Sequence, residues 1–264
     1  MSKPAALLAA LCLLVAAAAP AADEALASGE KTEVETVNWR AWRAGNQVDS
    51  LASLQRGARN FMNYCVTCHS LKYMRYSRMA ADLQIAPDQL QKFLMPIEAK
   101  SADYITTSLH ADDGITWFGK EPPDLSLMAR GRGVDYLYRF LKTFYTDTSR
   151  PTLTNNLTLE NAAMPAVLSD LGGVQEAVYT EVDKVVDGKP VKEKEFSHFE
   201  TTTPGRLTPL EFDGFVRDTV NFLDYVGDPS QNDRRSIGIW AVLFLLTLTW
   251  IAWLLKKEYW KDIH

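Results

Sequence analysis

The pentapeptide Cys65-Val66-Thr67-Cys68-His69 constrains this chain more than any other part of its sequence. Two cysteines separated by two residues and followed directly by a histidine form the attachment pattern of a c-type haem. Each sulfur adds to one vinyl group at the porphyrin edge, and the adjacent imidazole binds the iron as the proximal ligand. The motif therefore predicts a protein that carries electrons on one covalently bound haem c.

Two other chemistries use a pair of cysteines at this spacing. A zinc site would need a second pair of ligands, and the chain has one further cysteine, Cys12, in a segment that we expect to be removed. A redox-active dithiol would begin a helix that follows a strand, which is not the pattern around Cys65. The histidine in the fifth position favours haem over both.

The N-terminal residues 1–21 have the pattern of a secretory signal peptide. Lys3 precedes a leucine-rich and alanine-rich run, which ends in the small-residue sequence Ala19-Pro20-Ala21. Its removal would take Cys12 away and leave the two motif cysteines, so no structural disulfide is expected. Export also predicts that the body of the chain, residues 22–233, is periplasmic.

A second apolar run covers residues 237–255, which include no charged side chain. At about 1.5 Å per residue, such a helix spans the roughly 30 Å hydrocarbon core of a bilayer. Two arginines precede the run and two lysines follow it, so the local charges do not orient it. The signal peptide gives the orientation instead, since it predicts export of the N-terminal side. We therefore expect a single-pass protein of the bacterial inner membrane with a cytoplasmic tail at residues 256–264.

The exported body reads as one mainly helical domain. The chain has 264 residues, of which 47% are hydrophobic and 23% charged, and its formal net charge of −5 points to no nucleic-acid partner. Apolar residues at helical spacing predict one helix that is capped by Asp49 or Ser50 and runs into the motif, and a second from Val134 to Tyr145. A capping box at Thr208, with Pro209 and Glu211, predicts a third that ends at Gly227.

Two segments between these helices look irregular. Residues 99–124 carry glycine, proline and mixed polar residues and predict an extended loop. Residues 174–199 alternate around Asp187-Gly188 and predict a small hairpin. Residues 228–233 are expected to be a tether to the membrane span. The fold class is therefore a cytochrome c-type haem domain with long loop insertions, plus one C-terminal transmembrane helix.

A six-coordinate carrier needs a distal iron ligand, and methionine raises the redox potential relative to a second histidine. Met95-Pro96 and Met164-Pro165 both have the form of a ligand on a loop stiffened by proline. Met164 is better placed, since it lies between the helix at Val134 and the capped helix, where the distal loop of a small cytochrome normally runs. The remaining candidates are Met62, Met74, Met79, Met128, His110 and His198.

The haem propionates carry negative charge and need partners. Arg130 and Arg132 are candidates for charge-assisted hydrogen bonds to them. A pair of solvated arginines at the start of a helix is the alternative interpretation.

Several stretches, taken in order along the chain, match a known pattern. They are Gln55–Ala58, Met62–Tyr76, Pro122–Ser126, Asp135-Tyr136 and Met164-Pro165. With the C-terminal anchor, they closely resemble the cytochrome c1 family, which supplies the haem subunit of ubiquinol–cytochrome c oxidoreductase, the cytochrome bc1 complex. The resemblance covers essentially the whole mature chain.

The resemblance implies definite roles. Cys65 and Cys68 would hold the haem, and His69 and Met164 would ligate its iron. Arg132 would pair with a propionate, and Tyr136 and the region of Pro123 would line the pocket. The subunit would take an electron from the Rieske iron–sulfur protein and pass it to a cytochrome c in the respiratory chain, with cytochrome b accepting the anchor helix inside a dimeric complex.

One departure from the family pattern is visible. Many relatives carry histidine after the Met-Pro pair, where this chain has Ala166. The chain shows no acid, base or nucleophile constellation of its own, so we expect any enzymatic activity to belong to the complex. The competing function is a membrane-anchored, single-haem carrier that serves another oxidoreductase, and an open-site haem sensor is disfavoured by a methionine ligand.

Overall fold

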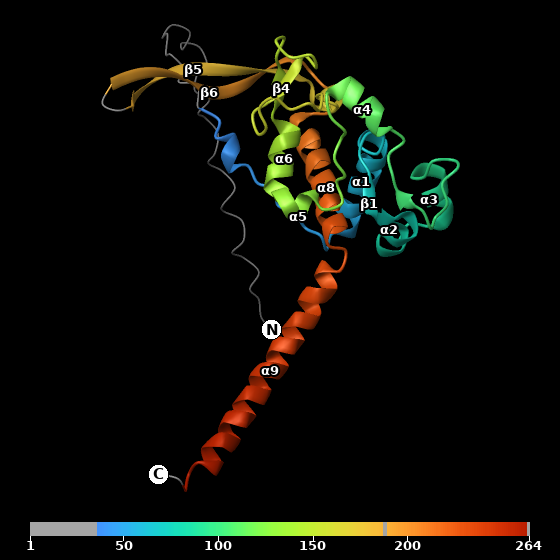
Figure 1. Ribbon diagram of the computed structural model, residues 1–264, viewed down its shortest axis with the longest axis vertical. Coiled ribbons are helices and arrows are strands. Elements are labelled where there is room, and N and C mark those ends of the chain that lie inside the picture. The colour runs from blue at the N-terminus through green and yellow to red at the C-terminus, as the bar shows by residue number, and fades with distance from the viewer. Residues whose placement is uncertain (1–35, 187–188, 263–264) are drawn as a thin grey trace, which may run out of the picture. The chain divides into compact units, whose positions relative to one another are not determined.

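The computed structural model describes residues 36–186 and 189–262, so the predicted signal peptide lies outside it. The helices are η1 (Trp39–Ala41), α1 (Leu51–Tyr64), α2 (Tyr76–Asp82), α3 (Pro87–Phe93), α4 (Ala111–Phe118), α5 (Met128–Arg132), α6 (Val134–Lys142), α7 (Ser169–Gly172), α8 (Pro209–Gly227) and α9 (Gln231–Tyr259). The strands are β1 (Leu71–Arg75), β2 (Tyr104–Ile105), β3 (Phe144–Thr146), β4 (Thr154–Asn156), β5 (Val174–Val186) and β6 (Lys189–Thr203). They form three antiparallel pairs, β1 with β2, β3 with β4 and β5 with β6. The expected class, a mainly helical domain with a C-terminal anchor helix, is confirmed (Figure 1).

Helices α1 and α8 pack side by side at the centre of the core (Figure 1). The apolar stripe of α1 buries Ala58 and Phe61 completely, and the Phe61 ring lies 5.9 Å from that of Phe222 on α8. Near the end of α1, the ring of Tyr64 meets that of Phe215 edge to face at 5.3 Å. This packing fixes the C-terminal end of α1, and with it the start of the cysteine motif, against the N-terminal half of α8.

The N-termini of α1 and α8 differ in their capping. Ser50 is the N-cap of α1, but its side chain makes no capping hydrogen bond. The capping box of α8 is confirmed: the amide of Glu211 donates to Thr208 Oγ1 at 3.3 Å, and the amide of Thr208 donates to Glu211 Oε2 at 2.9 Å.

Close approach of α1 and α8 depends on Gly57. A Cβ at this position would overlap the backbone carbonyl of Asp218 and lie 2.6 Å from Phe222 Cβ. Gly57→Ala is therefore expected to destabilise the domain by about 3 kcal/mol, the upper end of ordinary overpacking costs. Thermal unfolding of the purified holoprotein should show Tm lowered by roughly 6–12 °C.

Gly214 on α8 provides the matched control, because a Cβ there would meet no atom within 4 Å. Gly214→Ala should leave Tm unchanged or raise it slightly, since alanine favours helix over glycine by about 0.5–1 kcal/mol. An equal loss of stability in both variants would show that helix packing at Gly57 is not the cause.

Two predictions of secondary structure were wrong. The segment 99–124, expected to be a loop, contains β2 and the helix α4, which carries Asp112 and Asp113 in its first turn and ends at Gly119 with φ of +79°. Carboxylates at a helix N-terminus and a glycine in the left-handed region at its end are the usual boundary signals. The helix expected to reach Tyr145 stops at Lys142, because residues 144–146 pair with β4.

The predicted hairpin is present but longer than expected. Strands β5 and β6 are paired along their whole length, from Val174 opposite Thr203 to Val186 opposite Lys189. The expected turn of the hairpin at residues 187–188 lies outside the described residues. The chain just before η1 contacts this hairpin, because the amide of Val37 donates a hydrogen bond of 2.7 Å to the carbonyl of Ser197 on β6.

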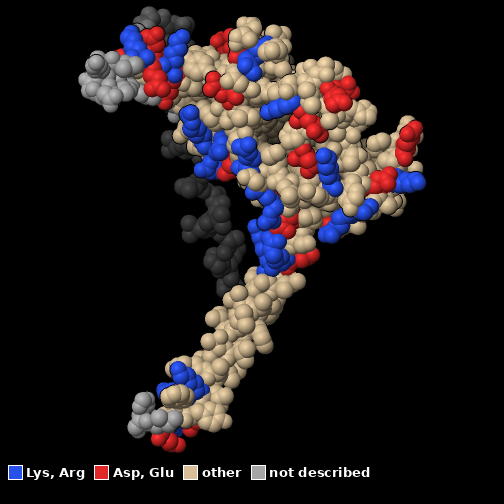
Figure 2. Space-filling view, viewed as in Figure 1, with Lys and Arg blue, Asp and Glu red and all other residues tan. Residues whose placement is uncertain are grey.

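Helix α9 contains the whole apolar run 237–255, and none of its described side chains is buried in the protein. Figure 2 shows a middle section of this helix free of charged residues, with charges at both ends. The expected tether of residues 228–233 is shorter than predicted, because α9 already begins at Gln231. Asp228 organises this junction by accepting from Arg234 at 2.5 Å and from Arg130 at 2.8 Å, which lowers the pKa of its carboxyl. Among the residues that the structure describes, α9 is thus the one helix long and apolar enough to serve as a single-pass anchor.

Candidate functional site

The cysteine motif folds into a tight turn at the end of α1. The amide of Cys65 donates to the carbonyl of Phe61 at 2.9 Å and so continues the helix by one step. The amides of Cys68 and His69 then both donate to the carbonyl of Cys65, at 3.1 and 2.8 Å. The turn holds the two thiols and the imidazole within one short segment beside α8.

His69 is oriented by a contact from a distant part of the chain. Its Nδ1–H donates to the backbone carbonyl of Pro123 at 2.8 Å, which leaves Nε2 as the free lone pair. Burial lowers the pKa of the imidazole, against smaller opposing effects of that hydrogen bond and of Asp124. A neutral ring with its second nitrogen hydrogen-bonded is the form in which histidine binds a metal.

The segment that supplies this carbonyl is itself tied to the motif region. The amide of Leu125 donates to the carbonyl of Ser70 at 2.9 Å, and Asp124 Oδ2 accepts from the amide of Lys72 at 2.8 Å. These bonds link the prolines at 122–123 to β1, although more than fifty residues separate them along the chain.

A cavity of about 160 Å³ adjoins the motif. Cys65, Cys68 and His69 lie on its wall together with Pro123, and Met164 contributes from a loop almost a hundred residues further along the chain. The other lining residues are Tyr64, Phe118, Lys120, Pro122, Leu141, Ala163, Pro165, Val167, Leu168, Phe215 and Thr219. The predicted proximal and distal ligands and both thiols therefore meet at one mostly apolar space.

The position of Met164 separates it from the other methionine candidates. Met74 and Met79 are buried in the core, and Met62, Met95 and Met128 pack against that core without lining the cavity. His110 and His198 do not line it either. The geometry thus favours Met164 over Met95, and its bond to iron stays a prediction.

The two arginines predicted to bind propionates have different surroundings. Arg130 is paired with Asp228 at 2.8 Å. Arg132 is exposed, and no carboxylate among residues 36–186 and 189–262 pairs with it. Its guanidinium lies 5.6 Å from the ring centroid of Tyr136, which in turn stacks on Phe140 at 6.2 Å. Arg132 is therefore available for an anionic group, but neither it nor Tyr136 lines the cavity, and their roles stay predictions.

Sequence reasoning missed several wall residues. Phe118 and Lys120 come from the segment that was expected to be a loop, where the Trp117-Phe118 pair before Gly119 could have signalled the end of an amphipathic helix. Phe215 and Thr219 belong to the helix predicted from the capping box, α8, but the sequence did not show that this helix lies beside the motif.

The donor set fits a covalently held haem. Cys65 and Cys68 are free, half-buried thiols, and burial raises the pKa of Cys65 to about 12 and also raises that of Cys68. In the described part of the chain, no three His, Cys, Asp or Glu side chains converge as a metal-binding group. Two thiols beside one oriented imidazole, with a thioether on the same cavity, suit a porphyrin better than a four-ligand zinc site.

The family of this chain follows from comparison of its sequence with known protein families. The profile of the Cytochrome C1 family matches residues 42–263. This chain belongs to the cytochrome c1 family. The resemblance found in the sequence is confirmed, and membership establishes a c-type cytochrome that carries electrons on a c-type haem.

Similar proteins carry two different names. Cytochrome c1 of Allochromatium vinosum is 45% identical over 195 residues, which cover 74% of this chain and 78% of the relative. A protein named ammonia monooxygenase gamma subunit, from Nitrosomonas europaea, is 41% identical over 192 residues, covering 73% of this chain and 75% of that protein. Cytochrome c1 of Rhodospirillum rubrum is 24% identical over 164 residues.

Proposed function

We propose that this cytochrome c1 family member accepts electrons from a Rieske iron–sulfur protein and passes them to a cytochrome c. It would work inside a dimeric bc1-type complex in which cytochrome b contacts the anchor helix. The observation that carries the proposal is that Cys65, Cys68, His69 and Met164 line one cavity in a chain of this family.

The residues at the cavity have separate tasks in this proposal. A bound haem supplies reversible one-electron chemistry at its iron. Cys65 and Cys68 would hold it by thioether bonds, while the Pro123 carbonyl keeps His69 in the tautomer that can ligate. Met164 would offer its thioether sulfur to the iron, and apolar walls such as Leu141 and Phe215 would exclude water. Arg132 offers a cation to a propionate.

The proposal is tested by asking with which proteins the chain associates. A tagged version purified in mild detergent is expected to bring cytochrome b and a Rieske protein with it. Its haem should be reduced by quinol only in their company, because a single haem takes up one electron whereas oxidation of a quinol to a quinone releases two. Purification as a lone haem protein, with normal quinol–cytochrome c activity in a deletion strain, would contradict the proposal.

A second candidate function follows from the Nitrosomonas relative. Its name assigns that protein to an ammonia monooxygenase, so a role as an anchored single-haem carrier for a different oxidoreductase is the alternative for this chain. The same purification separates the two, since the alternative predicts a different set of co-purifying subunits and no loss of quinol–cytochrome c activity on deletion.

We further propose that the haem domain is periplasmic and the C-terminus cytoplasmic. A short junction joins α8 to α9, so the domain must lie on the side of the membrane at which α9 begins. A reporter active only in the cytoplasm is expected to work when fused after His264 and to fail when fused after Gly227. The reverse pattern would show the opposite orientation.

A further inference from the structure

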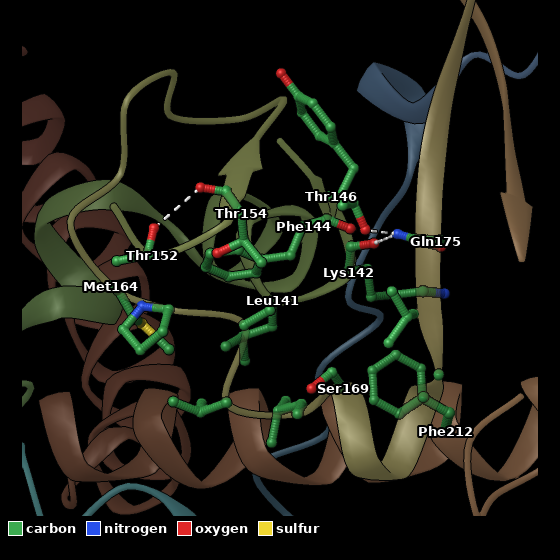
Figure 3. A pocket seen from close by; sticks show the side chains of 18 residues that line it. Leu141, Lys142, Phe144, Thr146, Thr152, Thr154, Met164, Ser169, Gln175 and Phe212 are labelled. Atoms are coloured by element: carbon green, nitrogen blue, oxygen red, sulfur yellow. Dashed lines mark hydrogen bonds between the residues drawn. The ribbon is translucent and has the colours of Figure 1, made fainter. Parts of the chain in front are cut away.

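The hollow beside the methionine loop, whose side chains Figure 3 shows, shares a wall with the proposed haem cavity. The residues that line both are Leu141, Met164, Pro165, Val167 and Leu168. The hollow therefore belongs to that site. Charged groups that the site does not use lie elsewhere, at the junction between α8 and α9, and Figure 2 shows Lys and Arg side chains together at the upper end of α9.

Two arginines from different helices meet on one carboxylate at this junction. Arg130 on α5 and Arg234 on α9 both donate to Asp228 Oδ2, at 2.8 and 2.5 Å. The side chain of Asp228 is only 10% exposed, whereas those of Arg130 and Arg234 are 54% and 60% exposed. A guanidinium has five N–H donors, so each arginine keeps donors for a second anion.

Arg235 adds a cation that has no counter-charge. Among residues 36–186 and 189–262, no carboxylate pairs with Arg235. Asp233 is close to it along the chain, but two residues correspond to roughly 200° around a helix, so the two side chains lie on opposite sides of α9. The side of the junction with Arg235 thus has three guanidiniums and one shielded carboxylate.

These arginines lie at the level of lipid headgroups when α9 crosses a membrane. The apolar run begins at Ile237, two residues after Arg235, which is about 3 Å along a helix axis. The headgroup layer on each side of the hydrocarbon core is about 5–7 Å deep. Arg130 is held near the same level by the shared carboxylate, and a hydrogen bond of 3.2 Å from Asn232 Nδ2 to the carbonyl of Val48 also fixes the first turn of α9 to the domain.

The surface of α9 directly below these arginines is open. Gly238 follows Arg234 by four residues and Arg235 by three, so it lies on their side of the helix, one turn nearer the centre of the bilayer. A Cβ at Gly238 would meet no atom within 4 Å. An acyl chain therefore has room against the helix beneath the guanidiniums.

From the level, the free donors and the unbalanced charge, we propose that Arg130, Arg234 and Arg235 bind the phosphate of an anionic phospholipid in the leaflet on the side of the domain. Guanidinium groups bind phosphate through paired, charge-assisted hydrogen bonds. A zwitterionic lipid also has a phosphate, but its ammonium group is repelled by the arginines, so the site selects lipids of net negative charge. The proposal does not depend on which proteins exchange electrons with the haem.

The test is native mass spectrometry of the purified full-length holoprotein, with any subunits that co-purify, titrated in mild detergent with phosphatidylglycerol or phosphatidylcholine. Wild type should bind phosphatidylglycerol more tightly. The double variant Arg234→Gln, Arg235→Gln should lower the affinity of the tightest phosphatidylglycerol site at least tenfold, since each arginine at an anionic membrane surface contributes about fivefold. The matched double variant Lys256→Gln, Lys257→Gln removes the same charge at the other end of α9 and should keep that site.

Arg130→Gln tests the contribution of the folded domain. It should weaken phosphatidylglycerol binding about fivefold. Arg206→Gln is its control and should bind as wild type, because Arg206 is likewise exposed and paired with a carboxylate, that of Asp170. Arg206 precedes α8, whose 19 residues place it roughly 28 Å from the junction. Retention of covalent haem and an unchanged Tm establish that each variant folds.

Four results would overturn the proposal. They are equal binding of the two lipids by wild type, undiminished phosphatidylglycerol binding in Arg234→Gln, Arg235→Gln, loss of the site in the lysine variant alone, and an unchanged affinity in Arg130→Gln. Inorganic phosphate at the concentration of the lipid should not displace phosphatidylglycerol. Displacement would show that the arginines take phosphate without a lipid, which also contradicts the proposal.

Discussion

A chain in which Cys65 and Cys68 are both replaced by serine is expected to lose all covalently held haem. Serine oxygen does not form the thioether to a vinyl group, and in the described part of the chain no other cysteine reaches the cavity. Acid-acetone extraction should remove the colour from the double variant and leave it with the wild-type protein. The comparison measures the attachment directly, without reference to activity.

Thr67→Ser is the matched control for this experiment, because the side chain of Thr67 is exposed within the same motif and does not line the cavity. Its haem should stay attached. Haem that remained with the protein after extraction of the double variant would refute covalent attachment through these cysteines.

The second large effect is expected for Met164→Leu. Leucine keeps the apolar volume but removes the sulfur, so the sulfur-to-iron charge-transfer band should disappear. The midpoint potential should fall by on the order of hundreds of millivolts, within the roughly 0.8 V that axial ligands span. A redox titration and an optical spectrum of the oxidised protein measure both quantities.

Met95→Leu is its control, since Met95 is the other methionine that precedes a proline and it packs against the core outside the cavity. That variant should keep the band and a potential close to that of wild type. The reverse pattern would move the distal ligand to Met95, and with it the architecture of the site.

Local patterns predicted those features whose cause is local. The capping box of α8 forms because Thr208 and Glu211 are three residues apart at a helix start. The apolar run of α9 spans nineteen residues, so its length and composition alone indicate a membrane helix. In the same way, the motif at Cys65 indicates haem attachment without knowledge of the fold, since the thiols and the imidazole are neighbours in the chain.

The wrong boundaries arose where distant residues decide the structure. Apolar spacing would extend α6 to Tyr145, but residues 144–146 instead pair with residues 154–156. The short junction before α9 depends on Asp228, whose arginine partners come from both α5 and α9. Hydrogen bonds and ion pairs of this kind override local helical preference, and a single sequence does not show them.

The sequence by itself determined that this chain carries a c-type haem motif, a mainly helical body and a C-terminal anchor, because each rests on residues that are adjacent or regularly spaced. Only the tertiary structure placed Met164 and Pro123 on the same cavity as Cys65 and His69, and left Arg132 without a carboxylate partner among the described residues. These features depend on which segments pack together and on the space left between them. Such packing depends on close approaches such as the one at Gly57, where the absence of a single Cβ lets α1 and α8 meet.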